Sequence, residues 1–95
     1  MEDLVDLMQR CEDDTRRILG RGVAGRLGKW RRYASSEQEL VEYIRRLLTG
    51  EHRENGWDLD RHGGLSLERI VVDHRPDLFN ENDHQEARRT LNIQA

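Results

Sequence analysis

Apolar residues recur along most of this chain at the three- and four-residue spacing of one face of an α-helix. Near the N-terminus five residues keep this spacing: Leu4, Val5, Leu7, Met8 and Cys11. Glu2 and Asp3 precede them, where acidic groups favour the start of a helix. The pattern predicts a helix over about 2–12 and, after Asp13 and Asp14 as cap residues, a second helix over about 15–20.

A second apolar stripe with helical spacing crosses the glycine-rich segment that follows: Leu19, Val23, Leu27, Trp30 and Ala34. Glycine in a helix interior costs about 1 kcal/mol relative to alanine. The glycines of segment 20–28 therefore favour a break near Gly20–Gly22. We predict that the next helix runs over about 22–33, with one side in the core.

The clearest helix boundary lies at Ser36, which has the spacing of a capping box with Glu39. The helix that follows, over about 37–49, carries the apolar positions of a central core helix: Leu40, Val41, Ile44, Leu47 and Leu48. It ends at Gly50, a residue type favoured just after helix C-termini. Segment 51–64 is polar and is predicted to be a loop.

Two shorter helices are predicted after this loop. Ser66 is expected to cap a helix over about 66–75 that ends before Pro76. Asn82 with Gln85 resembles another capping box and predicts a last helix over about 83–91. The chain is therefore predicted to be all-α, a single domain over 1–95 built as a compact bundle of five to six short helices.

Composition narrows the class of protein further. The 95 residues, of which 35% are apolar and 37% charged, allow one modest core. No apolar run approaches the roughly 20 residues of a membrane helix, and the acidic N-terminus lacks the layout of a signal peptide. The single cysteine excludes an internal disulfide and fits a reducing compartment. We expect a cytoplasmic protein without a membrane partner.

Charge is distributed very unevenly. The net charge is −3, yet segment 16–32 holds seven basic side chains and no acidic one: Arg16, Arg17, Arg21, Arg26, Lys29, Arg31 and Arg32. Most of these cations lie off the apolar stripe of the same segment. The sequence thus predicts a helix with an apolar inner side and a basic outer side, and the basic side indicates a charged contact surface.

The sequence motifs that could indicate cofactor binding, metal binding or catalysis are incomplete. Segment 20–25 matches the G-x-G-x-x-G dinucleotide pattern, but no buried strand precedes it, so the match is incidental. Segment 58–69 resembles an EF-hand calcium loop, but Arg69 stands where the bidentate glutamate belongs. The remaining candidate metal ligands have no spacing that fixes a site: Asp58, Asp60, His62 and His74. We expect no metal, no cofactor and no catalytic residue, and therefore no enzyme.

Three stretches taken together resemble a known family: LVDLMQRCEDDTRRIL, SSEQELVEYIRRLL and GGLSLERIV. Their order is similar to the small death-like, effector-associated helical domains of bacterial conflict and defence systems. In that family an acidic first helix and an Asp-x-x-Arg-Arg start to the second precede a Leu-Val helix and a Gly-Gly pair. The resemblance spans about residues 4–72. It implies a helical adaptor that couples the components of a defence system through contacts between charged faces.

The charge asymmetry and this resemblance predict a protein–protein interaction module, an adaptor or recruitment domain. Its basic helical face would bind an acidic surface on another protein or on another copy of the chain. The residues expected at the contact are Arg21, Arg26, Lys29, Trp30, Arg31 and Arg32.

Two alternatives remain open. A small immunity or inhibitor protein would mask the basic site of a toxin or nuclease with acidic residues: Glu51, Glu54, Asp58, Asp60, Asp73 and Asp77. A nucleic-acid-binding protein would use segment 16–32 for phosphates, with Trp30 and Tyr33 for base stacking. The sequence pI near 5.8 disfavours the second alternative, since nucleic-acid-binding domains are usually basic.

Overall fold

A computed structural model describes residues 2–50 and 53–92, and this part of the chain is largely helical and contains no strand. The α-helices are α1 (Leu4–Leu19), α2 (Arg21–Leu27), α3 (Glu37–Leu48), α4 (Arg53–Arg61), α5 (Leu67–Arg69) and α6 (Glu81–Leu91). Shorter turns join them: the 3₁₀ helices η1 (Gly28–Tyr33) and η3 (Pro76–Leu78) and the π-helical turn η2 (Ile70–His74). The predicted all-α bundle is confirmed.

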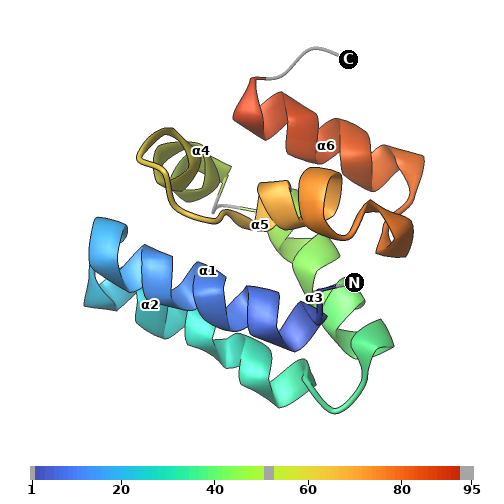
Figure 1. Ribbon diagram of the computed structural model, residues 1–95, viewed down its shortest axis with the longest axis horizontal. Coiled ribbons are helices and arrows are strands. Elements are labelled where there is room, and N and C mark those ends of the chain that lie inside the picture. The colour runs from blue at the N-terminus through green and yellow to red at the C-terminus, as the bar shows by residue number, and fades with distance from the viewer. Residues whose placement is uncertain (1, 51–52, 93–95) are drawn as a thin grey trace.

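Helices α1 and α2 form an antiparallel hairpin, and η1 extends α2 along the same side of α1 (Figure 1). The chain reverses at Gly20, whose φ of +101° lies in a region that a residue with a side chain rarely adopts. The N–H of Gly20 donates to the carbonyl oxygen of Thr15 at 3.1 Å, which closes the end of α1. The predicted break near Gly20–Gly22 is therefore confirmed.

The two helices predicted over 2–12 and 15–20 are one continuous helix, so that boundary was wrong. Asp13 and Asp14 lie inside α1, and the carboxylate of Asp14 accepts a hydrogen bond from the backbone N–H of Leu65 at 2.7 Å. The buried residues of α1 keep the same three- and four-residue spacing up to this region: Leu4, Leu7, Met8, Cys11 and Thr15 are all buried. Packing of this face outweighs the cap preference of the two aspartates.

Helix α3 begins where the sequence predicts. The hydroxyl of Ser36 accepts a hydrogen bond from the backbone N–H of Glu39 at 3.1 Å. The carboxylate of Glu39 accepts from the hydroxyl of Ser35 at 2.7 Å. Helix α3 then packs against α1, α5, α6 and η1, as expected of a central core helix.

The loop predicted over 51–64 contains helix α4 instead. Glu51 and His52 lie outside the described residues, and the chain is helical from Arg53 to Arg61. Leu59 is the buried apolar side chain of α4. Because one buried apolar position does not make a helical repeat, the sequence shows no detectable periodicity here. Contacts of α4 with α6, α1 and α5 provide the tertiary packing that stabilises this short helix.

The C-terminal helices follow the prediction with one correction. Ser66 caps α5 through a hydrogen bond from the N–H of Arg69 at 3.1 Å, and the helical segment ends at His74, before Pro76. Helix α6 begins at Glu81, because the capping box is formed by Asn80 and Asp83 and not by Asn82 and Gln85. Asn80 is extended and follows the buried Phe79, whereas Asn82 is already helical.

The core draws fully buried side chains from α1, α3, η2 and α6: Leu7, Met8, Leu40, Ile44, Ile70, Val71 and Ala87. Within residues 2–50 and 53–92, no helix is both long and apolar enough to cross a membrane.

Candidate protein-interaction surface

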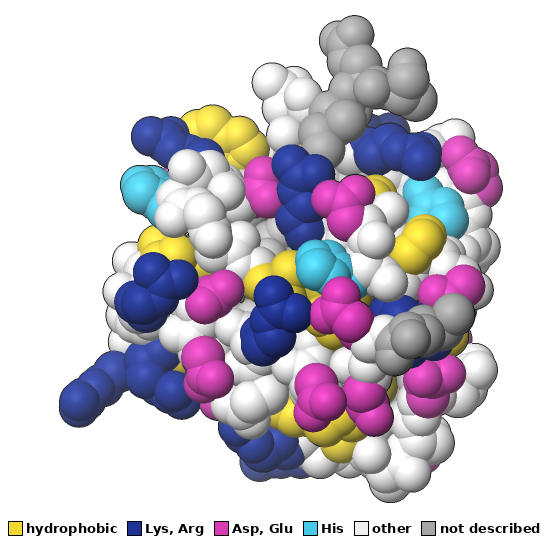
Figure 2. Space-filling model, viewed as in Figure 1, with side chains coloured by type: hydrophobic (Ala, Val, Ile, Leu, Met, Phe, Trp, Pro, Cys, Tyr) yellow, Lys and Arg dark blue, Asp and Glu magenta, His cyan; other side chains and the backbone are white. Residues whose placement is uncertain are grey.

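The segment α2–η1 has a buried side and an exposed side. Ala24 and Trp30 are buried, and Val23, Leu27 and Tyr33 are half-buried. The exposed positions are Arg21, Gly22, Gly25, Arg26, Lys29, Arg31 and Arg32. The structure therefore separates the predicted apolar stripe from the cations. Figure 2 shows Lys and Arg side chains gathered at the lower left, where the α1–α2 hairpin lies.

Trp30 lies in the core and not on the contact surface where the sequence analysis placed it. Its side chain is 3% exposed, and its indole N–H donates to Glu12 Oε1 at 3.2 Å. The ring is the last large apolar group of the inner stripe and packs in the same cluster as the buried side chains of α1. Trp30 can therefore neither contact a partner directly nor stack on a nucleic-acid base in this conformation.

Arg31 is also engaged within the molecule. Its two terminal nitrogens bind the two carboxylate oxygens of Glu12 at 2.7 and 2.9 Å, and the second nitrogen also donates to Gln9. Glu12 is only 2% exposed, and the hydrogen bond from Arg31 lowers the pKa of its carboxyl group despite the opposing effect of burial. Arg31 is thus a structural cation that joins η1 to α1.

Most other arginines whose side chains the structure describes are also held by carboxylates of the same chain: Arg10, Arg16, Arg17, Arg45, Arg69, Arg75, Arg88 and Arg89. Among the described side chains, the cations without a carboxylate within 4.0 Å are Arg21, Arg26, Lys29, Arg32, Arg46 and Arg61. We call the first four of these, all exposed on α2–η1, the basic face.

Two glycines, Gly22 and Gly25, lie among the cations of the basic face, and the packing of the described chain does not require a glycine at either position. A Cβ atom built on Gly22 or on Gly25 would meet no heavy atom within 4 Å. Gly28 differs, because a Cβ there would lie 3.0 Å from Glu12 Oε1. Of these three glycines, only Gly28 allows a close approach inside the fold, whereas Gly22 and Gly25 leave bare helix backbone between the cations.

Of the six acidic residues proposed for an inhibitor surface, three are paired with arginines. Asp60 and Asp73 both pair with Arg69, at 2.7 and 2.9 Å, and Asp77 pairs with Arg75 at 3.0 Å. The bond to Arg75 lowers the pKa of Asp77. Asp58 is half-buried on α4, while Glu51 and the side chain of Glu54 lie outside the described part. Among the four of these acids whose side chains are described, Asp60, Asp73 and Asp77 are thus compensated by arginines of the same chain.

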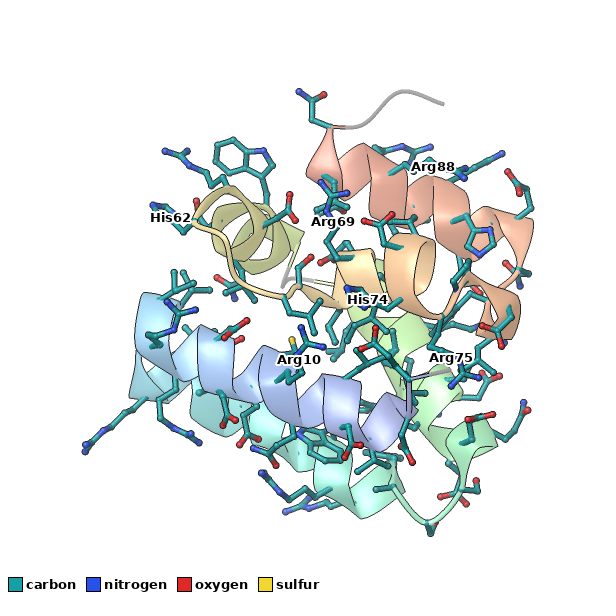
Figure 3. All side chains as sticks on the ribbon, in the orientation of Figure 1. Arg10, His62, Arg69, His74, Arg75 and Arg88 are labelled. Carbon is teal, nitrogen blue, oxygen red and sulfur yellow. The ribbon has the colours of Figure 1, made fainter. Side chains whose placement is uncertain are left out.

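The four candidate metal ligands are separated or already engaged. Asp60 binds Arg69, and Asp58 belongs to helix α4, so the segment does not form a calcium-binding loop. His62 Nδ1 lies 2.7 Å from the carbonyl oxygen of Asp58, and His74 Nδ1 lies 2.9 Å from Glu2. Figure 3 shows the two histidines on different elements. The described residues contain no group of three His, Cys, Asp or Glu placed to hold a metal ion.

Cys11 is equally unsuited to act as a nucleophile. The thiol is buried, and burial raises its pKa to about 12, with smaller increases from nearby carboxylates. A thiol with that pKa stays protonated near neutral pH and does not supply the reactive thiolate. Its position on the inner face of α1 agrees with the role of a small core side chain that the sequence indicated.

A feature that the sequence analysis missed lies beside the basic face. A half-open cavity of about 50 Å³, which we call the apolar pocket, lies where residues from α1, α2, α3, α4 and α5 meet. Half-buried aliphatic side chains surround it: Leu19, Val23, Leu27 and Leu47. Cys11, Leu59 and Leu67 line it from the core. Residues so distant in the sequence meet only through the tertiary fold, so no local pattern could have predicted the pocket.

Fold and surface together define a small all-α helical bundle in which the four exposed cations of the basic face have no carboxylate partner among the described side chains. Compared with protein-family models, with curated proteins and with solved structures, the chain matches none.

Proposed function

We propose that this protein is a cytoplasmic interaction module without catalytic activity, and that its basic face binds an acidic surface of a partner protein. The observation that supports this proposal is the selective pairing of cations. Arginines elsewhere in the described chain mostly have a carboxylate partner, whereas Arg21, Arg26, Lys29 and Arg32 have none. Exposed cations on one helix side attract an acidic surface and orient it during association.

The surroundings of the basic face favour a protein over a nucleic acid. Trp30 is buried, and the ring of Tyr33 stacks on that of Tyr43 with centroids 4.6 Å apart. Base stacking on this face would therefore require the core to open. The net charge of −3 also opposes the approach of a long polyanion, while a partner with one acidic patch experiences mainly the local field.

The same face suits the adaptor role that the family resemblance implies. An adaptor needs a surface whose charged groups are not used by its own fold, and arginine is enriched among the residues that dominate protein interfaces. The partner would then be another component of the same defence system, or a second copy of this chain.

Charge reversal on the basic face tests the proposal. A glutamate-rich peptide is titrated calorimetrically into the wild type and into the Arg26→Glu/Lys29→Glu variant at physiological salt. We expect the wild type to bind and the variant to lose at least tenfold in affinity with an unchanged melting temperature. The matched control Arg88→Glu/Arg89→Glu makes the same change in net charge on α6, far from α2 in Figure 3, and should bind like the wild type.

Two outcomes would contradict the proposal. One is equal binding of the peptide by all three proteins, which would mean that the basic face is not the contact. The other is tighter binding of duplex DNA than of the peptide. The affinity for DNA would then fall with salt with a logarithmic slope of about −0.9 for each phosphate contacted, and this result would assign the face to nucleic acid.

A further inference from the structure

The apolar pocket and the basic face share helix α2. Val23 lines the pocket, Arg26 lies three residues further on, and Lys29 three residues beyond that. Residues three apart on a helix are surface neighbours, about 5–6 Å between Cβ atoms. Arg26 of the basic face is therefore a neighbour of the pocket-lining Val23, and it has no carboxylate partner among the described side chains.

Helix α3 also contributes to the lining of the pocket. Leu47 lines it from α3, and Arg46, one residue earlier, is exposed and has no carboxylate partner in the described part. Figure 1 shows the end of α1 and the start of α2 below α4, where the pocket-lining residues of these helices lie. Arg46 is thus an exposed cation next to a lining residue in the sequence, but it is not itself a lining residue, since successive residues of a helix do not share a face.

The size of the pocket limits what can enter it. Sites for small molecules and cofactors usually measure about 300–1,000 Å³, several times the 50 Å³ found here. The available space fits the end of one aliphatic side chain. Six of the eleven lining residues are leucine or valine, and the others are Cys11, Thr15, Asn55, Gly56 and Glu68. Because Arg26 and the rest of the basic face lie on the same segment as Val23 and Leu27, the best match is an apolar side chain with carboxylates close to it on the same chain.

We propose that the apolar pocket and its cations bind an acidic amphipathic helix of a partner protein. This inference rests on the proposed function and specifies the partner. An aliphatic side chain of that helix enters the pocket, and glutamates or aspartates three or four positions away pair with Arg26, while further carboxylates meet the other cations of the basic face. Such spacing puts carboxylates one helical turn from the anchor, which corresponds to the offset of Arg26 from Val23.

Three synthetic peptides of equal length test this specificity. The first is helix-forming, with leucines at i, i+3, i+4 and i+7 and glutamates beside them, the second is polyglutamate, and the third replaces the glutamates of the first by lysines. Complete burial of one leucine corresponds to about 1.5–3 kcal/mol, or roughly 10- to 150-fold in affinity. We expect the first peptide to bind at least tenfold more tightly than polyglutamate, and the lysine peptide not to bind.

Variants of the pocket separate this inference from the proposed function. Val23 is half-buried and lies outside the main core cluster, so Val23→Asn should fold and should bind the leucine–glutamate peptide no better than polyglutamate. In the wild type, methyl signals of Leu19, Leu27 and Leu47 should shift with the leucine–glutamate peptide and not with polyglutamate. These methyl shifts do not depend on any variant being stable.

The results that overturn the inference are distinct from those that overturn the proposed function. If both acidic peptides bind equally and only Arg26→Glu/Lys29→Glu abolishes binding, the basic face is the contact and the pocket has no role. Equal binding of the lysine peptide would remove the role of the cations. If neither acidic peptide binds in a way that depends on Arg26 and Lys29, both this inference and the proposed function fail.

Discussion

At the scale of single residues, Glu12 is the side chain on which the position of η1 most depends. It is nearly inaccessible to solvent, yet it accepts hydrogen bonds from Trp30, Arg31 and Arg16. Gly28 leaves the space for its carboxylate. A buried carboxylate is stable only when its oxygens are paired, so Glu12 joins Trp30 and Arg31 of η1 to α1, and Arg16 of α1 itself completes the pairing.

Replacing Glu12 should therefore destabilise the fold. We expect Glu12→Gln to lower the free energy of unfolding by about 1–2 kcal/mol, since the charge-assisted bonds are lost but half-exposed Arg31 can be hydrated instead. Urea denaturation followed by tryptophan fluorescence measures this change. Asp13→Asn, on the exposed side of the same helix, should alter stability by less than about 0.5 kcal/mol. Equal effects of the two substitutions would contradict this role for Glu12.

Low pH should weaken the contact between Glu12 of α1 and the residues of η1. Arg31 holds the pKa of Glu12 below its ordinary value of 4.5, so the folded state binds fewer protons than the unfolded chain in this range. The stability that Glu12 contributes is then complete above about pH 4.5 and is lost as the pH falls through its lower folded-state pKa. Denaturation curves between pH 6 and 3 should fall more steeply for the wild type than for Glu12→Gln. Parallel curves would show that Glu12 is not perturbed.

Residue types alone could not have shown that Trp30 and Arg31 bind Glu12. The sequence analysis put both at the contact because they lie within the basic segment 16–32, although Trp30 also belongs to the apolar stripe. The acceptor that turns them inward, Glu12, lies eighteen residues before Trp30 and in another helix. Arg21, Arg26, Lys29 and Arg32 are exposed as the sequence indicated, because no such acceptor faces them.

At the scale of secondary-structure elements, helix α2 contains more glycine than its packing requires. Gly22 and Gly25 are exposed, and a side chain at either position would meet nothing. Neither has a positive φ, so alanine fits the backbone as it stands. The cost in helix propensity is about 1 kcal/mol for each glycine, which the fold itself does not offset.

Alanine substitutions along the chain should separate the two kinds of glycine. We expect Gly22→Ala and Gly25→Ala each to raise the free energy of unfolding by about 0.5–1 kcal/mol. Gly56→Ala should lower it, because a Cβ on α4 would clash with the buried carboxylate of Glu68. Thermal denaturation of the three variants decides between these expectations. Destabilisation by Gly22→Ala would indicate a packing role that the structure does not contain.

Elements with strong end signals were predictable and the others were not. Helix α3 has both the Ser36 cap and a complete apolar face, so its bounds followed from the sequence. Helix α4 has a weak apolar face, and its stability depends on neighbours such as α6 that are distant in the sequence. In α1, the preference of Asp13 and Asp14 for helix starts was misleading, because a continuous buried face kept the helix intact.

At the scale of the whole molecule, the net charge conceals the arrangement that matters for binding. Acidic groups outnumber basic ones, yet many exposed carboxylates are already paired with arginines of the same chain. Four of the six cations without a carboxylate partner among the described side chains lie on α2–η1, and Val23 and Leu27 of α2 line the apolar pocket. A partner that carries both acidic and aliphatic groups would complement this side of the bundle.

The central claim is that this side of α2–η1 is where an acidic partner binds, and backbone chemical shifts of the wild type test it most directly. The ¹⁵N-labelled protein is titrated with the leucine–glutamate peptide at physiological salt. The account predicts saturable shifts centred on amides 21–32, with smaller changes near Leu47. Saturable shifts centred on α6 or on the start of α1, with amides 21–32 unmoved, would contradict it.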